Sequence, residues 1–183
     1  MKFVLIRHPA VLIESGLCYG RLDVPAIPAA LARAGSLATG LAHLAPLRIS
    51  TSPARRCQDL ANLLAQKLNA PAVTDPRLLE LDFGAWEGKS WDVVPRSALD
   101  DWSASPLTFA PPGGETGSSL IARVRDFLGE IRLDRRNRIV VTHGGPLKVL
   151  TALLDGSPVD LLTAAPPVGS VRIFDVANTE DSA

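Results

Sequence analysis

Short apolar runs and segments with helical periodicity alternate along the chain, and this pattern predicts alternating strands and helices. Residues 2–6 and 138–142 are short, mainly apolar runs, which is typical of strands buried on both faces of a parallel sheet. Residues 116–131 instead repeat their apolar positions at the spacing of an amphipathic helix. Strands that alternate with helices indicate an α/β protein, and we expect a three-layer α/β/α sandwich around a mostly parallel central sheet.

Proline, glycine and capping residues mark the ends of the remaining elements. Pro28 opens an Ala- and Leu-rich segment that predicts a helix to about residue 44. Ser52 is a favourable N-cap and Pro53 a favourable first residue for a helix to about residue 68. A further helix should follow the sequence HGGP and end at about residue 154. The pattern also predicts short strands at 47–50, 72–74 and 171–176, a short helix within 91–102, and loops at 11–27, 78–89 and 109–114.

The size and charge of the chain narrow the class of protein. At 183 residues, of which 46% are hydrophobic, the chain is long enough for about one domain with a sizeable core. We expect residues 1–183 to form a single domain with a frayed tail after about residue 177. Lys plus Arg and Asp plus Glu both number 19, so the net charge is zero. This balance argues against a nucleic-acid-binding protein that relies on a strong basic field.

The sequence pattern also argues against a membrane or secreted protein. No apolar run approaches the roughly 18 residues that a membrane span needs. The first residues indicate a strand rather than a signal peptide. Without a secretion signal, Cys18 and Cys57 are expected to be reduced thiols, and we expect the protein to be cytoplasmic.

Three common catalytic or binding motifs do not fit the chain. The sequence GAWEGKS at 84–90 is one residue short of a phosphate-binding P-loop, because Phe83 stands where the first glycine is required. The absence of a G-x-S-x-G sequence argues against an α/β-hydrolase. Neither C-x-x-C nor H-E-x-x-H occurs, so the spacing of histidines and cysteines predicts no metal site.

Two histidines follow predicted strands. His8 comes after the first strand and His143 after the strand at 138–142. Ligands of open α/β sheets bind beyond the carboxyl ends of the strands, so the two side chains could meet there. The alternative is that they are two unrelated loop residues. The third histidine, His43, lies in a predicted helix, and we expect it to be a surface or core residue without a catalytic role.

Both histidines have neighbours that are suited to binding an anion. Arg7 precedes His8, and Arg56 lies in the helix that follows the strand at 47–50, so both can reach the same end of the sheet. His143 is followed by Gly144 and a helix start, where free backbone N–H groups attract anions. Two arginines, two histidines and a helix N-terminus would form a compact phosphate pocket.

Five short motifs occur in the order found in one enzyme family. They are Arg7-His8-Pro9, Ser52-Pro53-x-x-Arg56, Leu79-Glu80 leading into Phe83-Gly84-x-Trp86-Glu87-Gly88, Gly113-Gly114-Glu115-Thr116 and Thr142-His143-Gly144-Gly145. Over roughly residues 1–155 the sequence therefore resembles the histidine phosphatase superfamily, the phosphoglycerate-mutase-like enzymes. The sequence around Tyr19 and Arg21, GLCYGRLDVP, is similar to the α-ribazole phosphatase branch, which acts in cobalamin assembly.

The resemblance implies a mechanism that proceeds through phosphohistidine. His8 would be the nucleophile. Arg7, Arg56 and His143 would surround the phosphoryl oxygens, with His143 protonated for this role. Gly144 would add a phosphate contact at the helix N-terminus. Because cationic side chains hold the phosphoryl group, the resemblance implies no metal or other cofactor, and the expected partner is a small phosphorylated substrate.

Further roles follow from the same resemblance. Glu80 would be the general acid that protonates the leaving group and then the base that activates water, which requires a raised pKa. Arg55 competes with its neighbour for the arginine position, and the family spacing from Ser52 favours Arg56. Four residues are candidates for the substrate loop, with a structural role as the alternative: Tyr19, Arg21, Trp86 and Glu115.

The sequence departs from the family pattern at two positions and leaves three functions open. Pro9 stands where relatives usually have Gly, and Lys148 stands where many have Arg.

The long insertions of true mutases are missing, which favours a phosphatase, with α-ribazole 5′-phosphate as the suggested substrate. The alternatives are a phosphoglycerate mutase, a broad-specificity phosphatase and a non-catalytic binding module. The sequence leaves the oligomeric state open.

Overall fold

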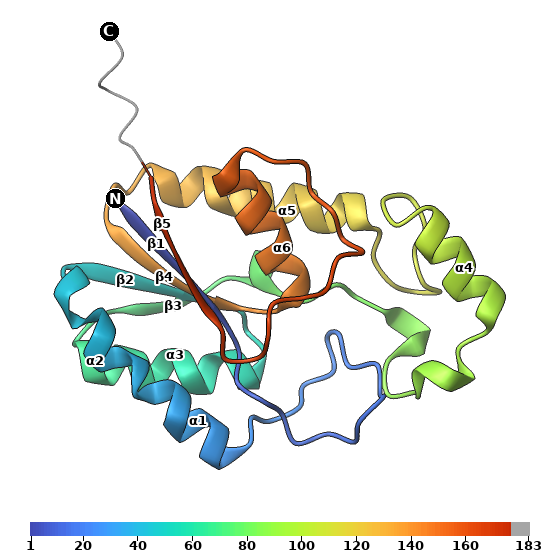
Figure 1. Ribbon diagram of the computed structural model, residues 1–183, viewed down its shortest axis with the longest axis horizontal. Helices are drawn as coiled ribbons and strands as arrows, with labels where there is room; N and C mark the ends of the chain where they lie inside the picture. The colour runs from blue at the N-terminus through green and yellow to red at the C-terminus, as the bar shows by residue number, and fades with distance from the viewer. Residues whose placement is uncertain (177–183) are drawn as a thin grey trace, which may run out of the picture.

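A five-stranded sheet forms the middle layer of the protein, as seen in a computed structural model that describes residues 1–176 (Figure 1). Four neighbouring strands run parallel, and β5 pairs antiparallel with β1 at one edge. The mostly parallel sheet that the sequence predicts is therefore confirmed. Across the sheet the order is β3 (Ala72–Thr74), β2 (Leu47–Thr51), β4 (Asn137–Thr142), β1 (Lys2–Arg7) and β5 (Val171–Asp175).

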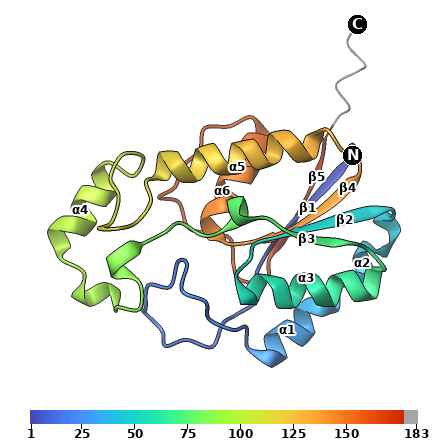
Figure 2. The same cartoon turned by 180° about the vertical axis from the view of Figure 1, so that it is seen from behind.

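Helices cover both faces of the sheet, which confirms the three-layer α/β/α sandwich (Figures 1 and 2). One face is covered by α1 (Pro28–Gly35), α2 (Leu37–Leu41) and α3 (Arg55–Leu68). The other face is covered by α5 (Gly117–Arg132) and α6 (Gly144–Asp155). In the long segment between β3 and α5, α4 (Arg96–Ala104) lies beyond the end of the sheet.

The two apolar cores explain why β1 is apolar at successive positions. Val4 and Ile6 are buried in the core formed with α2 and α3. Phe3 and Leu5 are buried in the core formed with α5 and α6. Successive side chains of a strand point to opposite faces, so a central strand that is covered on both faces needs apolar residues throughout.

The single helix predicted for residues 28 to 44 is wrong. The segment contains α1, α2 and a 3₁₀ helix at Ala42–Leu44. The break falls at Ser36, whose hydroxyl donates to the Arg33 carbonyl oxygen (2.7 Å). A serine that bonds a nearby carbonyl competes with the helical hydrogen bonds. Gly35 also packs so closely against Leu63 of α3 that a side chain there would overlap it.

The helix start predicted at Ser52 is also wrong. The helix α3 begins at Arg55, and its N-cap is Ala54. The Ser52 backbone N–H donates to the Val141 carbonyl oxygen (3.0 Å), so Ser52 continues the line of β2 beside β4. Because this hydrogen bond joins Ser52 to the sheet, the helix begins only after it, at Arg55.

The short helix predicted within 91–102 is confirmed, and a proline sets where it begins. Trp91–Val93 form a 3₁₀ helix, and the α-helix α4 starts at Arg96. Pro95 disfavours the helical conformation of the residue before it, and Val94 is accordingly extended (φ −71°, ψ 129°). The loop predicted at 78–89 contains the 3₁₀ helix Gly84–Trp86, and the 3₁₀ helix Pro76–Leu78 ends at its first residue.

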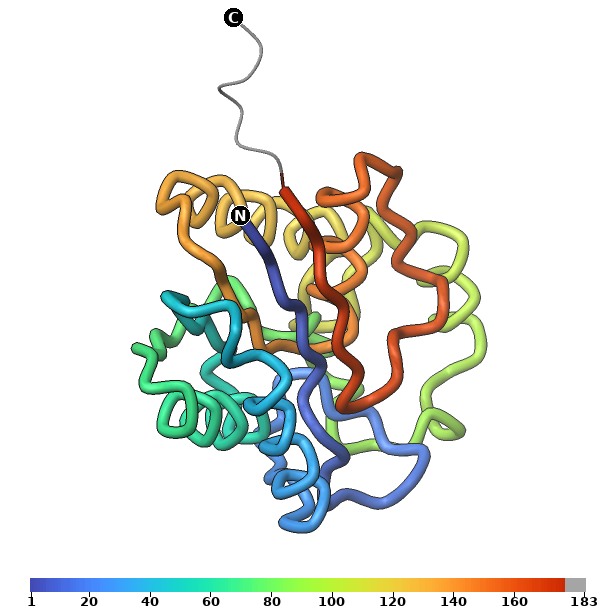
Figure 3. Tube along the Cα trace, turned by 60° about the vertical axis from the view of Figure 1, so that its left-hand side comes forward, coloured from blue at the N-terminus to red at the C-terminus, as the bar shows by residue number. Residues whose placement is uncertain are grey.

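Connecting segments follow the carboxyl ends of the parallel strands. Figure 3 shows β1 beside β5, with its carboxyl end entering the loop that leads to α1. The tail predicted to fray lies outside the described residues. Within residues 1–176, no helix has the length and apolar character needed to cross a membrane.

Candidate active site

The structure brings His8 and His143 together at the end of the sheet. β1 and β4 pair in parallel with Arg7 opposite Thr142, so the residues that follow each strand are neighbours. The two imidazole centroids lie 5.2 Å apart, and both side chains are buried. The His8 backbone N–H donates to the Thr142 carbonyl oxygen (3.0 Å), which extends the ladder by one further hydrogen bond.

One ring nitrogen of His8 is bound to the backbone. His8 Nδ1 lies 2.8 Å from the Pro9 carbonyl oxygen. A carbonyl can only accept, so Nδ1 carries the proton and Nε2 keeps a lone pair. Burial lowers the pKa of His8 to about 3, and the charges of Arg56 and Arg7 add to this effect. His8 is therefore a neutral imidazole at pH 7.

Arg56 points into the site, whereas Arg55 points away from it. Arg56 is fully buried and donates to the carbonyl oxygens of Gly20 (2.7 Å) and Leu22 (2.9 Å). Arg55 is exposed, and its guanidinium lies 3.7 Å from Asp59 on the surface of α3. Adjacent helical residues point about 100° apart, which is why only one of the two can enter the site.

Arg7 and Gly144 meet beside the histidines. The Arg7 guanidinium donates to the Pro166 carbonyl oxygen, and its backbone N–H donates to Ser170 (3.1 Å). A Cβ built at Gly144 would lie 3.5 Å from the Arg7 guanidinium carbon. The first backbone N–H groups of α6 and a positive side chain therefore lie at the same end of the site, as anion binding requires.

Glu80 faces the site from the segment between β3 and α5. Its Oε1 accepts from the backbone N–H groups of Gly145 (2.9 Å) and Leu81 (3.1 Å). Glu80 lines two small cavities. Arg7 and Tyr19 line the first, of about 150 Å³, and Gly145 lines the second, of about 170 Å³. The carboxyl group thus lies between the arginine side of the site and the start of α6.

His143 is held by two buried side chains, Ser52, which follows β2, and Cys57 of α3. Its Nε2 lies 2.7 Å from Ser52 Oγ and 3.6 Å from Cys57 Sγ. Burial, and next the charge of Arg56, lower the pKa of His143 well below its usual range. The low pKa favours the neutral ring, whereas the protonated state that the resemblance implies depends on the negative charge of a phosphate and stays a prediction.

Comparison with known proteins identifies the family. A family model for the histidine phosphatase superfamily (branch 1) matches residues 3–181. The chain belongs to this superfamily. It is 30% identical to glucosyl-3-phosphoglycerate phosphatase of Mycolicibacterium vanbaalenii, over 87% of this chain and 76% of that protein. It is 29% identical to phosphoserine phosphatase 1 of Hydrogenobacter thermophilus, over 85% of this chain and 77% of that protein.

The solved structures that resemble this chain include an α-ribazole phosphatase. The α-ribazole phosphatase of Shigella flexneri superposes with a TM-score of 0.86 at 26% identity, covering 97% of this chain and 91% of that chain. The superfamily and the activities named for these relatives make the present protein a phosphatase. The expected family and enzyme class are confirmed.

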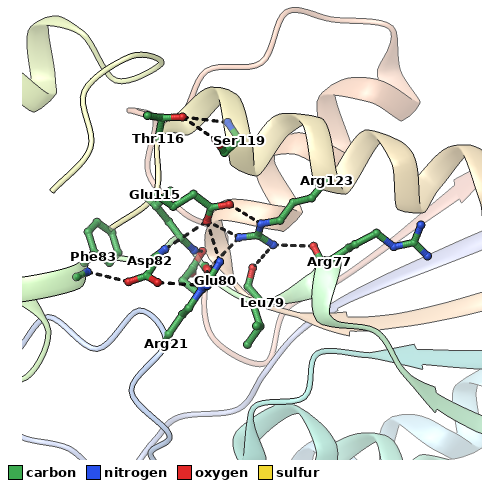
Figure 4. A network of polar contacts seen from close by, with 12 residues as sticks. Arg21, Arg77, Leu79, Glu80, Asp82, Phe83, Glu115, Thr116, Ser119 and Arg123 are labelled. Atoms are coloured by element: carbon green, nitrogen blue, oxygen red, sulfur yellow. Dashed lines mark hydrogen bonds and ion pairs between the residues drawn. The ribbon is translucent and has the colours of Figure 1, made fainter. Parts of the chain in front are cut away.

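The four candidate substrate-loop residues of this histidine phosphatase have different surroundings. Tyr19 lines a cavity with Arg7, and its ring centroid lies 6.4 Å from that of His8. Arg21 and Glu115 instead point toward each other and toward Arg123 behind Glu80 (Figure 4). Trp86 is buried among aromatic side chains of the 83–109 segment.

Three residues at the site escaped the sequence interpretation. Cys57 lies against His143, and Arg123 binds the chain around Glu80. Ser52 lies beside His143, although its sequence suggests only a helix cap. The single sequence signal for Arg123 is an arginine that flanks the apolar stripe of a predicted amphipathic helix. His43, as expected, lies away from the site and is exposed.

The two residues that depart from the family pattern, Pro9 and Lys148, both make hydrogen bonds through or to the backbone. Pro9 supplies the carbonyl that binds His8 and is buried. Lys148 donates to the Leu161 carbonyl oxygen (2.7 Å), and burial lowers its pKa. Within residues 1–176, no group of three or more His, Cys, Asp or Glu side chains is arranged to hold a metal ion.

We expect acid to destabilise the protein through its two buried histidines. Their pKa values are lower in the folded protein than in the unfolded chain, so only the unfolded chain takes up protons as the pH falls below 6.5. The free energy of unfolding should fall by up to about 1.4 kcal/mol per pH unit for each histidine. For His8 this window extends down to its folded pKa of about 3.

Urea unfolding between pH 7 and pH 5 measures this effect. The control is the His8→Gln/His143→Gln double variant, which retains the carboxylates that also titrate in acid. The variant should lose less stability than the wild type across this interval. Equal losses would contradict the assignment of neutral, buried histidines.

Proposed function

We propose that this histidine phosphatase hydrolyses phosphomonoesters of small molecules through a phosphohistidine at His8. The observation that carries the proposal is the hydrogen bond from His8 Nδ1 to the Pro9 carbonyl oxygen (2.8 Å). Since this bond holds the proton on Nδ1, the lone pair of Nε2 is available to attack phosphorus. The low pKa of His8, about 3, keeps that nitrogen unprotonated at neutral pH.

The phosphoryl group is bound by groups of positive or donor character. Arg7 and Arg56 supply the charge, and the backbone at Gly144 supplies helix N-terminal donors. Phosphoryl transfer spreads negative charge over the equatorial oxygens, so fixed cations stabilise the transition state. The arginines thus serve twice, because they also disfavour protonation of His8.

His143 serves as a neutral hydrogen-bond donor. Ser52 Oγ accepts from the Ala54 backbone N–H (3.3 Å), so its own proton is available for His143 Nε2 (2.7 Å). A hydroxyl proton on that bond leaves the imidazole proton on Nδ1, which can donate to a phosphoryl oxygen. A bound phosphate also raises the pKa of His143, so the ring gains positive character as the substrate enters.

The reaction then has two displacements. In the first, His8 Nε2 forms a bond to phosphorus as the ester oxygen leaves, and Glu80 gives that oxygen its proton. In the second, the Glu80 carboxylate takes a proton from water while the water oxygen attacks phosphorus and the bond to Nε2 breaks. Inorganic phosphate leaves, and His8 and the protonated Glu80 return to their initial states.

For the substrate, we propose α-ribazole 5′-phosphate. Two observations support it: the sequence GLCYGRLDVP that contains Tyr19, and the TM-score of 0.86 with an α-ribazole phosphatase. Tyr19 lines the cavity beside Arg7 and Glu80, where the alcohol half of an ester would lie. The loop that carries the branch resemblance is therefore part of the site.

We expect His8→Ala to abolish turnover. Wild-type protein quenched during turnover should carry phosphate in an acid-labile, base-stable linkage, as expected of phosphohistidine. Arg55→Ala is the matched control, because its exposed side chain lies outside the site, and it should retain wild-type turnover. Label on a serine or aspartate, or substantial activity of His8→Ala, would refute the nucleophile.

Glu80→Gln should slow phosphoenzyme formation from alkyl phosphates by roughly 10²–10⁴-fold. The amide keeps the volume and can still accept from Gly145, but it cannot transfer a proton. A nitrophenolate leaves as a stable anion, so nitrophenyl phosphate should lose much less. Pre-steady-state bursts on both esters measure the difference. Equal losses would mean that Glu80 is not the acid.

Among the substrates named for its relatives, α-ribazole 5′-phosphate should be hydrolysed with the highest kcat/KM. The comparison uses phosphoserine and glucosyl-3-phosphoglycerate, with release of inorganic phosphate as the readout. Preference for either of those esters would contradict the substrate. Transfer of phosphate from a bisphosphoglycerate to a second phosphoglycerate, without release of phosphate, would instead identify a mutase.

A further inference from the structure

A partly buried arginine on α5, Arg123, binds the chain around Glu80. All five N–H groups of Arg123 donate to acceptors (Figure 4). Three of the bonds reach carbonyl oxygens, those of Arg77 (2.6 Å), Leu79 (2.7 Å) and Glu80 (3.0 Å). The other two reach the Glu115 carboxylate as a bidentate pair (2.7 and 2.8 Å).

Within residues 77–80, the remaining carbonyl, that of Leu78, also accepts a hydrogen bond. Thr142 Oγ1 donates to the Leu78 carbonyl oxygen (2.6 Å). Four consecutive carbonyls, at residues 77–80, are therefore bound by side chains from α5 and from the end of β4. Glu80 lies outside any helix or strand. Side chains therefore supply the hydrogen bonds that the backbone N–H groups of a helix or sheet would otherwise give to these carbonyls.

Glu115 completes a partly buried cluster of charged side chains next to Glu80. It also binds Arg21 (3.2 Å), whose guanidinium lies 3.2 Å from Asp82. Burial alone would raise the pKa of Glu115, but its hydrogen bonds and charge pairing with Arg123 outweigh burial and hold the pKa below its usual range. Glu115 is thus a carboxylate that keeps the Arg123 guanidinium in one orientation.

We propose that Arg123 is a positioning residue for Glu80, and that Glu115 acts through Arg123 rather than on the substrate. The inference rests on the proposed function, since it assigns how the acid reaches its place. The backbone of Glu80 is set by Arg123, and its carboxyl oxygen Oε1 is set by the Gly145 backbone N–H (2.9 Å). With both ends held, Oε2 is the oxygen presented to the leaving group.

Lysine cannot replace arginine in this role. An ammonium has three donors on one atom, whereas the five N–H groups of guanidinium lie in a rigid plane. Arg123→Lys therefore keeps the charge beside Glu115 but loses the simultaneous hold on three carbonyls. The acid should move while the phosphate-binding residues, which lie on other elements, stay in place.

The test compares phosphoenzyme formation from an alkyl phosphate and from nitrophenyl phosphate in Arg123→Lys. The alkyl rate should fall about 10- to 100-fold, in the range that a misplacement of about 1 Å costs. The nitrophenyl rate should fall less than about threefold, because that leaving group needs little protonation. Inhibition by vanadate, which reports the phosphate site, should be unchanged. Arg125→Lys, an exposed position on the same helix, is the control and should match the wild type.

Two further variants keep the test decisive. Glu115→Gln preserves the shape of the cluster and should show the same selective loss, so it carries the test if thermal unfolding shows that Arg123→Lys does not fold. In the Glu80→Gln background, Arg123→Lys should cost nothing further on the alkyl ester, because two residues that act through one group are not additive.

The outcomes separate the two proposals. Equal losses on both esters in the folded variants would overturn the inference, because they would show a general structural role. If Glu80→Gln shows the selective loss but the Arg123 and Glu115 variants do not, the inference fails while the proposed function stands. If Glu80→Gln shows no selective loss, the acid assignment fails and the positioning role fails with it.

Discussion

The parallel pairing of β1 with β4 places Arg7 opposite Thr142, so that His8 and His143 emerge side by side. The side chains of a strand alternate between faces, and a shift of one residue would move every side chain of β1 to the wrong core. The apolar packing of Phe3 and Val4 on opposite faces therefore also sets the register at the end of the sheet where the two histidines lie. The packing that stabilises the sheet also buries the two imidazoles and so removes them from water.

Electrostatics at the site follow from that burial. Neutral imidazoles lie among guanidinium groups, and the cations that would repel a proton from His8 would attract a phosphate. Arg56 is fully buried, and the backbone carbonyls of Gly20 and Leu22 accept two of its hydrogen bonds. The N-terminal loop thus does more than connect β1 to α1, since it holds the arginine on which phosphate binding would rest.

The backbone supports His8 and Glu80 in different ways. His8 stands at the end of a central strand, whose position the whole sheet determines. Glu80 stands on an irregular segment, where side chains such as Arg123 and Thr142 bind the carbonyls instead. Irregular segments can vary in sequence without disturbing the sheet, and the positioning role proposed for Arg123 would keep the Glu80 carboxyl group in register with His8.

The sequence by itself determined the alternation of strands and helices, the family motifs and the choice of Arg56 over Arg55, because apolar periodicity and residue spacing are local properties of the chain. Only the tertiary structure decided the break at Ser36, the contact of Ser52 with His143, the neutral state of that histidine and the turn of Glu115 toward Arg123. These depend on burial and on hydrogen bonds between residues distant in sequence. Periodicity carries no information about them, since a polar residue looks the same in a sequence whether it meets solvent, substrate or a buried partner.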